Sequence, residues 1–175
     1  MGPVIRRAVP ADAEALSALA DRLFLQTFVE ELKIPYPVAD LAAFLAYANG
    51  VDAMDRRLRD PDVGLWIAEH DGQAVAYAMA AEADLPHPDL KLWHGMLSRL
   101  YLEPAWRGQG LAAPMLEAAL AWLAETYSPR PWLTVWEGNH RAQRFYARHG
   151  FEACGACDYP VGAWIDREIV MRRSG

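Results

Sequence analysis

The sequence predicts an α/β fold in which helices cover a mixed β-sheet. Helical spacing dominates the first sixty residues, strands follow, and a helix, a strand, a helix and two strands complete the chain. Asp71-Gly72 lies between two apolar runs and is typical of a hairpin turn, so part of the sheet is antiparallel. The chain has 175 residues and no repeat or linker, which indicates one domain over residues 1–175.

The N-terminal third reads as a short strand followed by two helical stretches. Residues 4–8 are extended, and Pro10 and Asp12 then supply helix-opening signals. Apolar side chains recur at helical spacing up to Phe28, and Ile34-Pro35-Tyr36-Pro37 ends that helix. Residues 38–59 form the second stretch, which we expect to be interrupted at Asn49-Gly50.

The remaining elements are predicted from changes in the spacing of apolar residues along the sequence. Strands are predicted at 65–68, 74–79, 93–102, 132–136, 151–158 and 163–172. Helices are predicted at 111–127 and 139–149, the second stopped by Gly150.

Composition excludes several classes of function. Seventeen Lys and Arg against 23 Asp and Glu give a formal net charge of -6, which is unlike a nucleic-acid binder. No apolar run approaches the ~20 residues of a membrane span. The first residues turn polar at once, without the apolar stretch of a signal peptide, so we expect a cytoplasmic protein with no membrane partner.

The two cysteines, Cys154 and Cys157, have the spacing of a redox or zinc motif. A redox pair of this kind normally opens a helix, whereas this segment reads as a strand, on which residues three apart point to opposite faces. We therefore interpret both as structural cysteines and expect no metal site.

A glycine-rich turn between a strand and a helix is the most informative segment. Glycines allow close approach of a ligand, and amides at a helix start form an anion cradle, so residues 107–112 predict a phosphate or pyrophosphate site. A P-loop would need a terminal Gly-Lys-Ser/Thr, which is missing. The dinucleotide pattern G-x-G-x-x-A does match Gly108, Gly110 and Ala113, but five residues separate it from the strand. An ordinary glycine-containing turn is a further alternative.

Two motifs, in the expected order, carry a resemblance to a known family. Arg107-Gly108-Gln109-Gly110-Leu111-Ala112 resembles the R/Q-x-x-G-x-G/A motif of the GNAT N-acetyltransferases, and residues 135–151 resemble the family's V-x-x-x-N-x-x-A-x-x-F-Y-x-x-x-G-F. The pattern is most similar to the bacterial spermidine/spermine acetyltransferase branch. The resemblance implies a single GNAT-like domain, α/β (α+β), with a mixed, mostly antiparallel sheet flanked by about four helices.

The resemblance also implies a donor and its binding residues. Acetyl-CoA would be the co-substrate, held by Leu100, Tyr101, Leu102, Arg107, Gly108, Gln109, Gly110, Leu111, Ala112 and Asn139. Tyr146 would be the general acid that protonates the CoA thiolate. Helical spacing supports this reading, because Asn139, Ala142 and Tyr146 share one helix face and a phenol of pKa ~10 is protonated at neutral pH.

The implied reaction is direct attack by an amine on the thioester, with both substrates bound together. The general base is left open among Glu82, Asp84, His94 and a water chain, because Ser98-Arg99 occupies the middle of the cofactor strand. The acceptor would lie near residues 28–37 and 158–164, with Phe28, Tyr36 and Glu82 as candidate substrate-binding residues.

The resemblance implies a small-molecule amine as acceptor, with a polyamine as one hypothesis. A peptide N-terminus, an amino acid or an aminoglycoside are alternatives within the same chemistry. A non-catalytic acyl-CoA-binding protein and a dinucleotide-binding oxidoreductase are alternatives outside it. We expect a monomer or homodimer that binds no nucleic acid.

Overall fold

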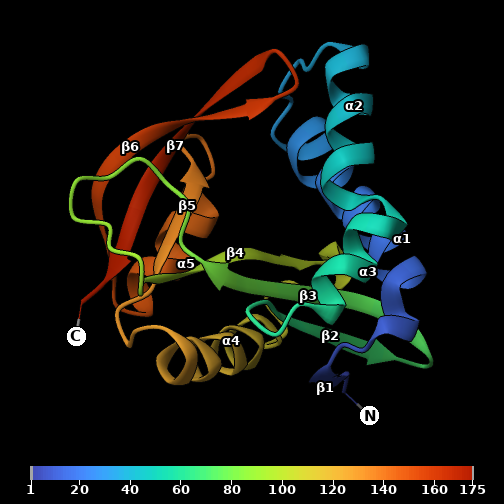
Figure 1. The fold of residues 1–175 in the computed structure, drawn as a ribbon. Helices are drawn as coiled ribbons and strands as arrows, with labels where there is room; N and C mark the ends of the chain where they lie inside the picture. Colours follow the sequence, from blue (N-terminus) through green and yellow to red (C-terminus); the bar gives the residue numbers. More distant parts are fainter. Residues whose placement is uncertain (1, 175) are drawn as a thin grey trace.

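The computed structural model describes residues 2–174 and contains one seven-stranded sheet (Figure 1). The strand order is β1-β2-β3-β4-β5-β7-β6, and every neighbouring pair is antiparallel except β4 and β5, which are parallel. The sheet is therefore mixed and mostly antiparallel, as expected. The strands are β1 (Val4–Arg7), β2 (Gly64–His70), β3 (Gln73–Glu82), β4 (Gly95–Leu102), β5 (Trp132–Trp136), β6 (Phe151–Val161) and β7 (Trp164–Arg173).

Five α-helices and three shorter helical segments accompany the strands over the described residues 2–174. Gly50 divides the second predicted stretch into two helices, which is why there is one helix more than the four expected. The helices are η1 (Pro10–Asp12), α1 (Ala13–Phe24), the π-helix η2 (Leu25–Glu31), α2 (Val38–Asn49), α3 (Val51–Arg59), η3 (Pro104–Trp106), α4 (Ala112–Thr126) and α5 (His140–Arg148).

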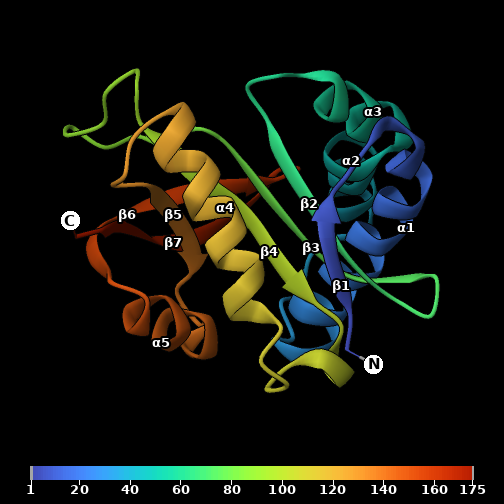
Figure 2. The ribbon, with the colours of Figure 1, turned by 90° about the horizontal axis from the view of Figure 1, so that it is seen from below.

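Helices cover both faces of the sheet, so each face has its own apolar core. On one face α1 buries Leu16, Leu19 and Leu23 against β2 and β3. On the other face α4 buries Met115 and Leu116 against β2, β3 and β4. Figure 2 shows the two groups on opposite sides, with α4 lying across β4 and with α1, α2 and α3 together.

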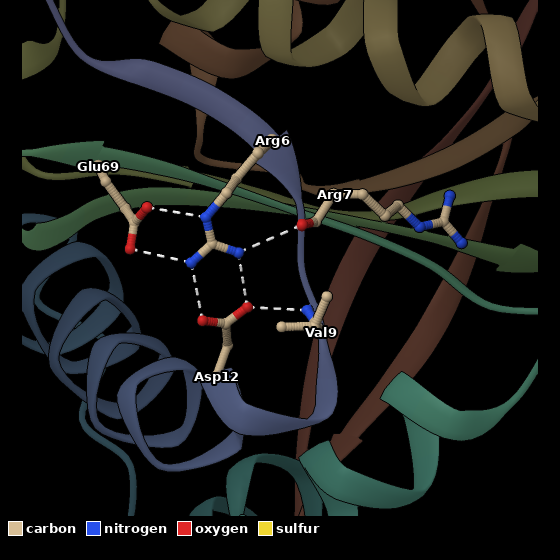
Figure 3. Close-up of polar contacts among 5 residues, drawn as sticks. All are labelled: Arg6, Arg7, Val9, Asp12 and Glu69. Carbon is tan, nitrogen blue, oxygen red and sulfur yellow. Dashed lines mark hydrogen bonds and ion pairs between the residues drawn. The ribbon is translucent and has the colours of Figure 1, made fainter.

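An arginine with two carboxylates fixes the start of the chain (Figure 3). Arg6 on β1 donates from Nε to Glu69 of β2 at 2.8 Å, and from Nη1 and Nη2 to Asp12 at 2.7 and 2.8 Å. Asp12 also accepts the amide of Val9 at 2.8 Å. The Arg6 guanidinium holds the pKa of Asp12 below its usual range. The ion pair of Arg6 with Asp12 joins the edge strand β1 to the start of α1.

The β2–β3 hairpin confirms the turn signal at Asp71-Gly72. Asp71 and Gly72 both have positive φ, 50° and 75°, between β2 and β3. At the tip of the β6–β7 hairpin, the Ala163 amide donates to Asp40 of α2 at 2.9 Å. This contact explains why the hairpin reaches across to α2 in Figure 1.

The sheet opens at its centre. The parallel pair β4 and β5 is in register only at Met96 and Trp132, whereas β3 pairs with β4 along its length. Beyond Met96 the two strands diverge, which leaves one edge of β4 without a neighbouring strand. This gap separates strands β1 to β4 from strands β5, β7 and β6.

Both cysteines are free thiols on β6, Cys154 exposed and Cys157 buried. A bulge near Ala153 and Gly155 interrupts the pairing of β6 with β7 there. Among residues 2–174, no three His, Cys, Asp or Glu side chains are grouped as metal ligands. None of the helices described is both long enough and apolar enough to cross a bilayer.

Candidate active site

Two cavities lie along the opening between β4 and β5. The outer cavity has a volume of about 430 Å³ and extends to the glycine turn before α4. The inner cavity has a volume of about 110 Å³ and lies among β4, β5, the β6–β7 hairpin, and helices α1, η2 and α2. Both are lined by Leu100, Tyr101, Asn139, Ala142 and Tyr146, so the two cavities meet at this common wall.

The glycine turn has the geometry of an anion cradle at one end of the outer cavity. Gly108 and Gly110 have φ of 75° and 82°, and a Cβ on either would meet no protein atom within 4 Å. Leu111 precedes α4 without a side-chain cap. Within residues 2–174, the amides of 108–111 donate to no backbone or side-chain acceptor. Free amides at a helix start fit a phosphate group, so these residues suit the diphosphate of a CoA ester.

Arg107 holds this turn in place with its side chain. Its Nε donates to the Leu102 carbonyl at 3.0 Å, its Nη1 pairs with Glu31, and its Nη2 donates to Thr27 at 3.3 Å. The Arg107 amide donates to Pro104. Arg107 lines the outer cavity, but its guanidinium is engaged by the protein, so the open amides begin at Gly108.

The end of β4 presents backbone to the same cavity. Leu100, Tyr101 and Leu102 line it on the edge that faces the gap, as the expected pairing with an extended ligand requires. The Leu102 carbonyl already accepts from Arg107. The Tyr101 ring is half-buried and stacks on Tyr77 with the ring centroids 5.7 Å apart, so its side chain supports the cavity wall.

Asn139 and Tyr146 project from α5 toward the junction of the cavities. Asn139 caps α5, because its Oδ1 accepts the Ala142 amide at 3.1 Å. Its amide nitrogen is the group that remains for a ligand. Tyr146 is 9% exposed, and its hydroxyl makes no hydrogen bond to the described residues. Burial raises the pKa of Tyr146 well above its ordinary value, so the phenol stays protonated.

The sequence analysis did not identify two arginines that line the outer cavity. Arg141 and Arg148 line it from α5, and Arg141 lies 3.3 Å from Glu31. They are seven residues apart, which places both on one helix face. That spacing was a usable signal, because it puts two positive charges on one face of α5.

Aromatic rings and two carboxylates form the inner cavity. Its aromatic lining is Phe24, Phe28, Tyr36, Phe44, Tyr77, Tyr101, Trp136, Tyr146 and Tyr159. Asp166 is 6% exposed and accepts from Tyr36 Oη at 2.5 Å and Trp164 Nε1 at 3.0 Å. Glu168 lines the cavity too, and its buried Oε2 has no hydrogen-bond partner among residues 2–174.

The structure separates the expected acceptor residues. Phe28 and Tyr36 line the inner cavity. Glu82 lines neither cavity, so the structure gives no support to its expected role in binding the acceptor. It pairs with Gly95 at the start of β4, whereas the cavities adjoin the end of β4, and antiparallel pairing places these points at opposite ends of the strand.

The other candidates for the general base are also missing from the residues that line the two cavities. Asp84 and His94 line neither cavity, and the His94 ring lies 5.7 Å from that of Trp132. The sequence analysis missed Asp166 and Glu168 instead. Their positions two apart on a terminal strand were a signal, because such residues share one face of the sheet.

Comparison with known proteins agrees with this geometry. The family model described as acetyltransferase (GNAT) family matches residues 23–151. An uncharacterized N-acetyltransferase of Mycobacterium tuberculosis is 36% identical over 164 residues, which cover 93% of this chain and 97% of that protein. A spermine/spermidine N(1)-acetyltransferase of Bacillus subtilis is 34% identical over 101 residues, 55% of this chain and 62% of that protein.

Solved structures share the fold at low identity. A PaiA N-acetyltransferase of Thermoplasma acidophilum, in complex with coenzyme A, has a TM-score of 0.76 at 16% identity and covers 100% of both chains. A ribosomal-protein-alanine N-acetyltransferase of Brucella melitensis has a TM-score of 0.64 at 21% identity, covering 97% of this chain and 98% of that one. The second name specifies an acceptor, a ribosomal-protein alanine, and the first specifies none, so the shared fold does not identify the acceptor of this chain.

Proposed function

The chain belongs to the acetyltransferase (GNAT) family, and on that premise we propose that residues 1–175 form one acetyl-CoA-dependent N-acetyltransferase domain acting on a primary amine. The amine attacks the thioester carbonyl directly while both substrates are bound. The meeting of the two cavities at Tyr146 carries this proposal, because it gives donor and acceptor separate spaces that share one reactive wall.

The donor would occupy the outer cavity. The amides from Gly108 to Ala112 would bind the diphosphate, with positive charge from Arg141 and Arg148 beside it. The arm that carries the thioester would run along Leu100 to Leu102 and complete the open edge of β4. The amide nitrogen of Asn139 would donate to this arm.

Tyr146 would act as general acid. The phenol is protonated at neutral pH, and its hydroxyl has no partner among residues 2–174 that would compete for the proton. When the C–S bond breaks, the thiolate takes that proton and leaves as the neutral thiol. The buried wall around the ring keeps water away from the transfer.

A cationic amine suits the inner cavity best. Carboxylates of Asp166 and Glu168 supply negative charge, and the aromatic lining attracts an ammonium group through the ring faces. The formal net charge of -6 favours the approach of a cation. A polyamine is our first proposal for the acceptor, supported by the named activity of the B. subtilis relative.

The test compares Tyr146→Phe with Tyr47→Phe as a matched control, since Tyr47 is 81% exposed on α2 and lines neither cavity. Acetylation is measured with spermidine, spermine, a peptide, an amino acid and an aminoglycoside. We expect Tyr146→Phe to bind acetyl-CoA normally and to lose ~10² to 10⁴ in kcat. The control keeps wild-type turnover.

Three results would contradict parts of this proposal. A loss in kcat of less than about threefold would remove Tyr146 as the general acid. Turnover of another amine, with none of spermidine or spermine, would remove the polyamine. Tight acetyl-CoA binding without turnover of any amine would favour the non-catalytic acyl-CoA-binding alternative.

A further inference from the structure

Glu168 on β7 is a half-buried acid that lines the cavity where the amine is expected, and its buried Oε2 has no hydrogen-bond partner among residues 2–174. We propose that Glu168 is the general base, which takes a proton from the acceptor's ammonium group so that the free amine can attack. This inference rests on the proposed function, because it assigns the proton acceptor of that same reaction. It replaces the earlier candidates Glu82, Asp84 and His94.

Position is the first argument. Glu168 and Tyr146 line the same inner cavity, and Tyr146 also lines the outer one. A base on the acceptor side and an acid at the junction are the arrangement that a direct transfer requires. Trp136 on β5 pairs in register with Glu168, so the carboxylate stands beside the strand that borders the gap.

The contrast with Asp166 is the second argument. Both acids stand on β7, two residues apart and therefore on one face. Both carboxylate oxygens of Asp166 are engaged, Oδ2 by Tyr36 and Oδ1 by Trp164. Oε2 of Glu168 has no such partner within the described residues. A buried oxygen without a partner is costly to a fold, and a ligand that donates a proton to it would remove that cost.

The surroundings of Glu168 support its protonation chemistry. Burial raises its pKa to about 7, with a further increase from Asp166, while a hydrogen bond with Thr134 of β5 lowers it. A base of this pKa is ionised often enough at neutral pH to accept a proton and then releases it readily. The other titratable groups facing it are Tyr36 before α2, Tyr101 on β4, and Cys157 and Tyr159 on β6.

Arg99 does not neutralise this carboxylate. Its guanidinium donates to Asn49 Oδ1 at 2.7 Å and to the Ala48 carbonyl at 3.2 Å. Among residues 2–174, Glu168 forms no ion pair. The cation that completes the site is therefore the acceptor itself.

The proton balance is complete with these groups. The ammonium gives one proton to the Glu168 carboxylate, and the nitrogen lone pair then forms a C–N bond to the thioester carbonyl carbon. The C–S bond breaks, and the sulfur leaves with its electron pair and takes the proton of Tyr146. The second nitrogen proton restores the phenol, and Glu168 returns its proton to solvent as the products leave.

The kinetic test uses Glu168→Gln, with Glu152→Gln as the control because Glu152 is exposed on β6 and lines neither cavity. The acceptor is the amine of the preceding panel that gives the highest turnover, and kcat/KM is measured from pH 5.5 to 10 because it reports the ionisation of the free protein and the free amine. The wild type and the control should lose activity below a midpoint near 7, where Glu168 is protonated.

Glu168→Gln should lose ~10² to 10⁴ in kcat/KM at pH 7 and lack that midpoint. Its rate should instead rise tenfold per pH unit toward the pKa of the amine, because only amine already neutral in solution can react. A Gln variant with the wild-type pH profile would overturn the assignment.

A second measurement needs no acceptor. The protein is labelled with ¹³C at glutamate carboxyls, and the NMR signals are titrated in the wild type and in Glu168→Gln. One signal should titrate near pH 7 and be missing in the variant, whereas a midpoint below 5 would overturn the proposal. Absence of turnover in the wild type would contradict the proposed function, and the NMR titration would still decide whether Glu168 has the properties of this base.

Discussion

Replacing Gly110 with alanine tests the anion cradle, because the effect on folding can be separated from the effect on binding. Gly110 has a φ of 82°, and a Cβ there would stand in open space beside the outer cavity. Gly72, in the β2–β3 turn, has a φ of 75° and equally open surroundings, but it lines neither cavity. Gly72→Ala is therefore a matched control for backbone strain.

The expected loss of stability is similar in the two variants. An alanine in this left-handed conformation costs about 1–2 kcal/mol. The smaller entropy of the unfolded chain offsets ~0.4–1 kcal/mol of that cost. A net loss of about 1 kcal/mol lowers Tm by ~2–4 °C in a chain of this length. Thermal unfolding without ligand measures this shift.

The expected loss of binding is confined to Gly110→Ala. A methyl group beside the amides would keep the diphosphate from close approach, and one lost hydrogen bond to a charged group costs ~1.5–3 kcal/mol. This corresponds to a CoA Kd weaker by ~10- to 150-fold, which titration calorimetry can measure. The reasoning is refuted if Gly110→Ala and Gly72→Ala bind CoA with the same Kd.

Two further predictions concern the caps and the N-terminal ion pair. Asn139→Ser should keep the cap of α5, whereas Asn139→Ala should lose ~1 kcal/mol of stability. Both variants should weaken acetyl-CoA binding to the same extent, because neither retains the amide donor. Unequal Kd values for the two variants would contradict this prediction. Asp12→Asn should lower the free energy of unfolding by ~1 kcal/mol at pH 7. Because the folded-state pKa of Asp12 lies below the ordinary 3.8, its stabilisation is present above that value and is lost as pH falls below it. Urea unfolding at pH 7 and pH 3 should show the difference from wild type shrinking, and a constant difference would count against the pair.

Local patterns predicted the elements well because they depend on short-range chemistry. The turn at Asp71-Gly72, the break at Gly50 and the strand Trp132–Trp136 each follow from nearby residues. The anion cradle could be predicted in the same way, because it consists of consecutive backbone amides in the glycine turn before α4. The role of Arg107 was less accessible, because its partners Thr27 and Glu31 are about 80 residues away in the chain.

The inner cavity could not be predicted, because it depends on how distant segments meet. Glu82 looked suitable from its position after a strand, but the register of β3 with β4 carries it away from the cavity. Glu168 becomes notable only once β7 is inserted between β5 and β6, an order that periodicity does not specify. Whether an acid is solvated or left without a partner is a property of the assembled fold.

The single paired position between β4 and β5 has a thermodynamic consequence for the order of substrates. The wall of the inner cavity draws on both sides of the divided sheet, with Leu100 and Tyr101 on one side and Thr134 and Glu168 on the other. A donor lying between the sides fixes their separation and thereby sets the dimensions available to the acceptor. Linkage then requires reciprocity: whatever factor the donor adds to the acceptor's affinity, the acceptor must add to the donor's.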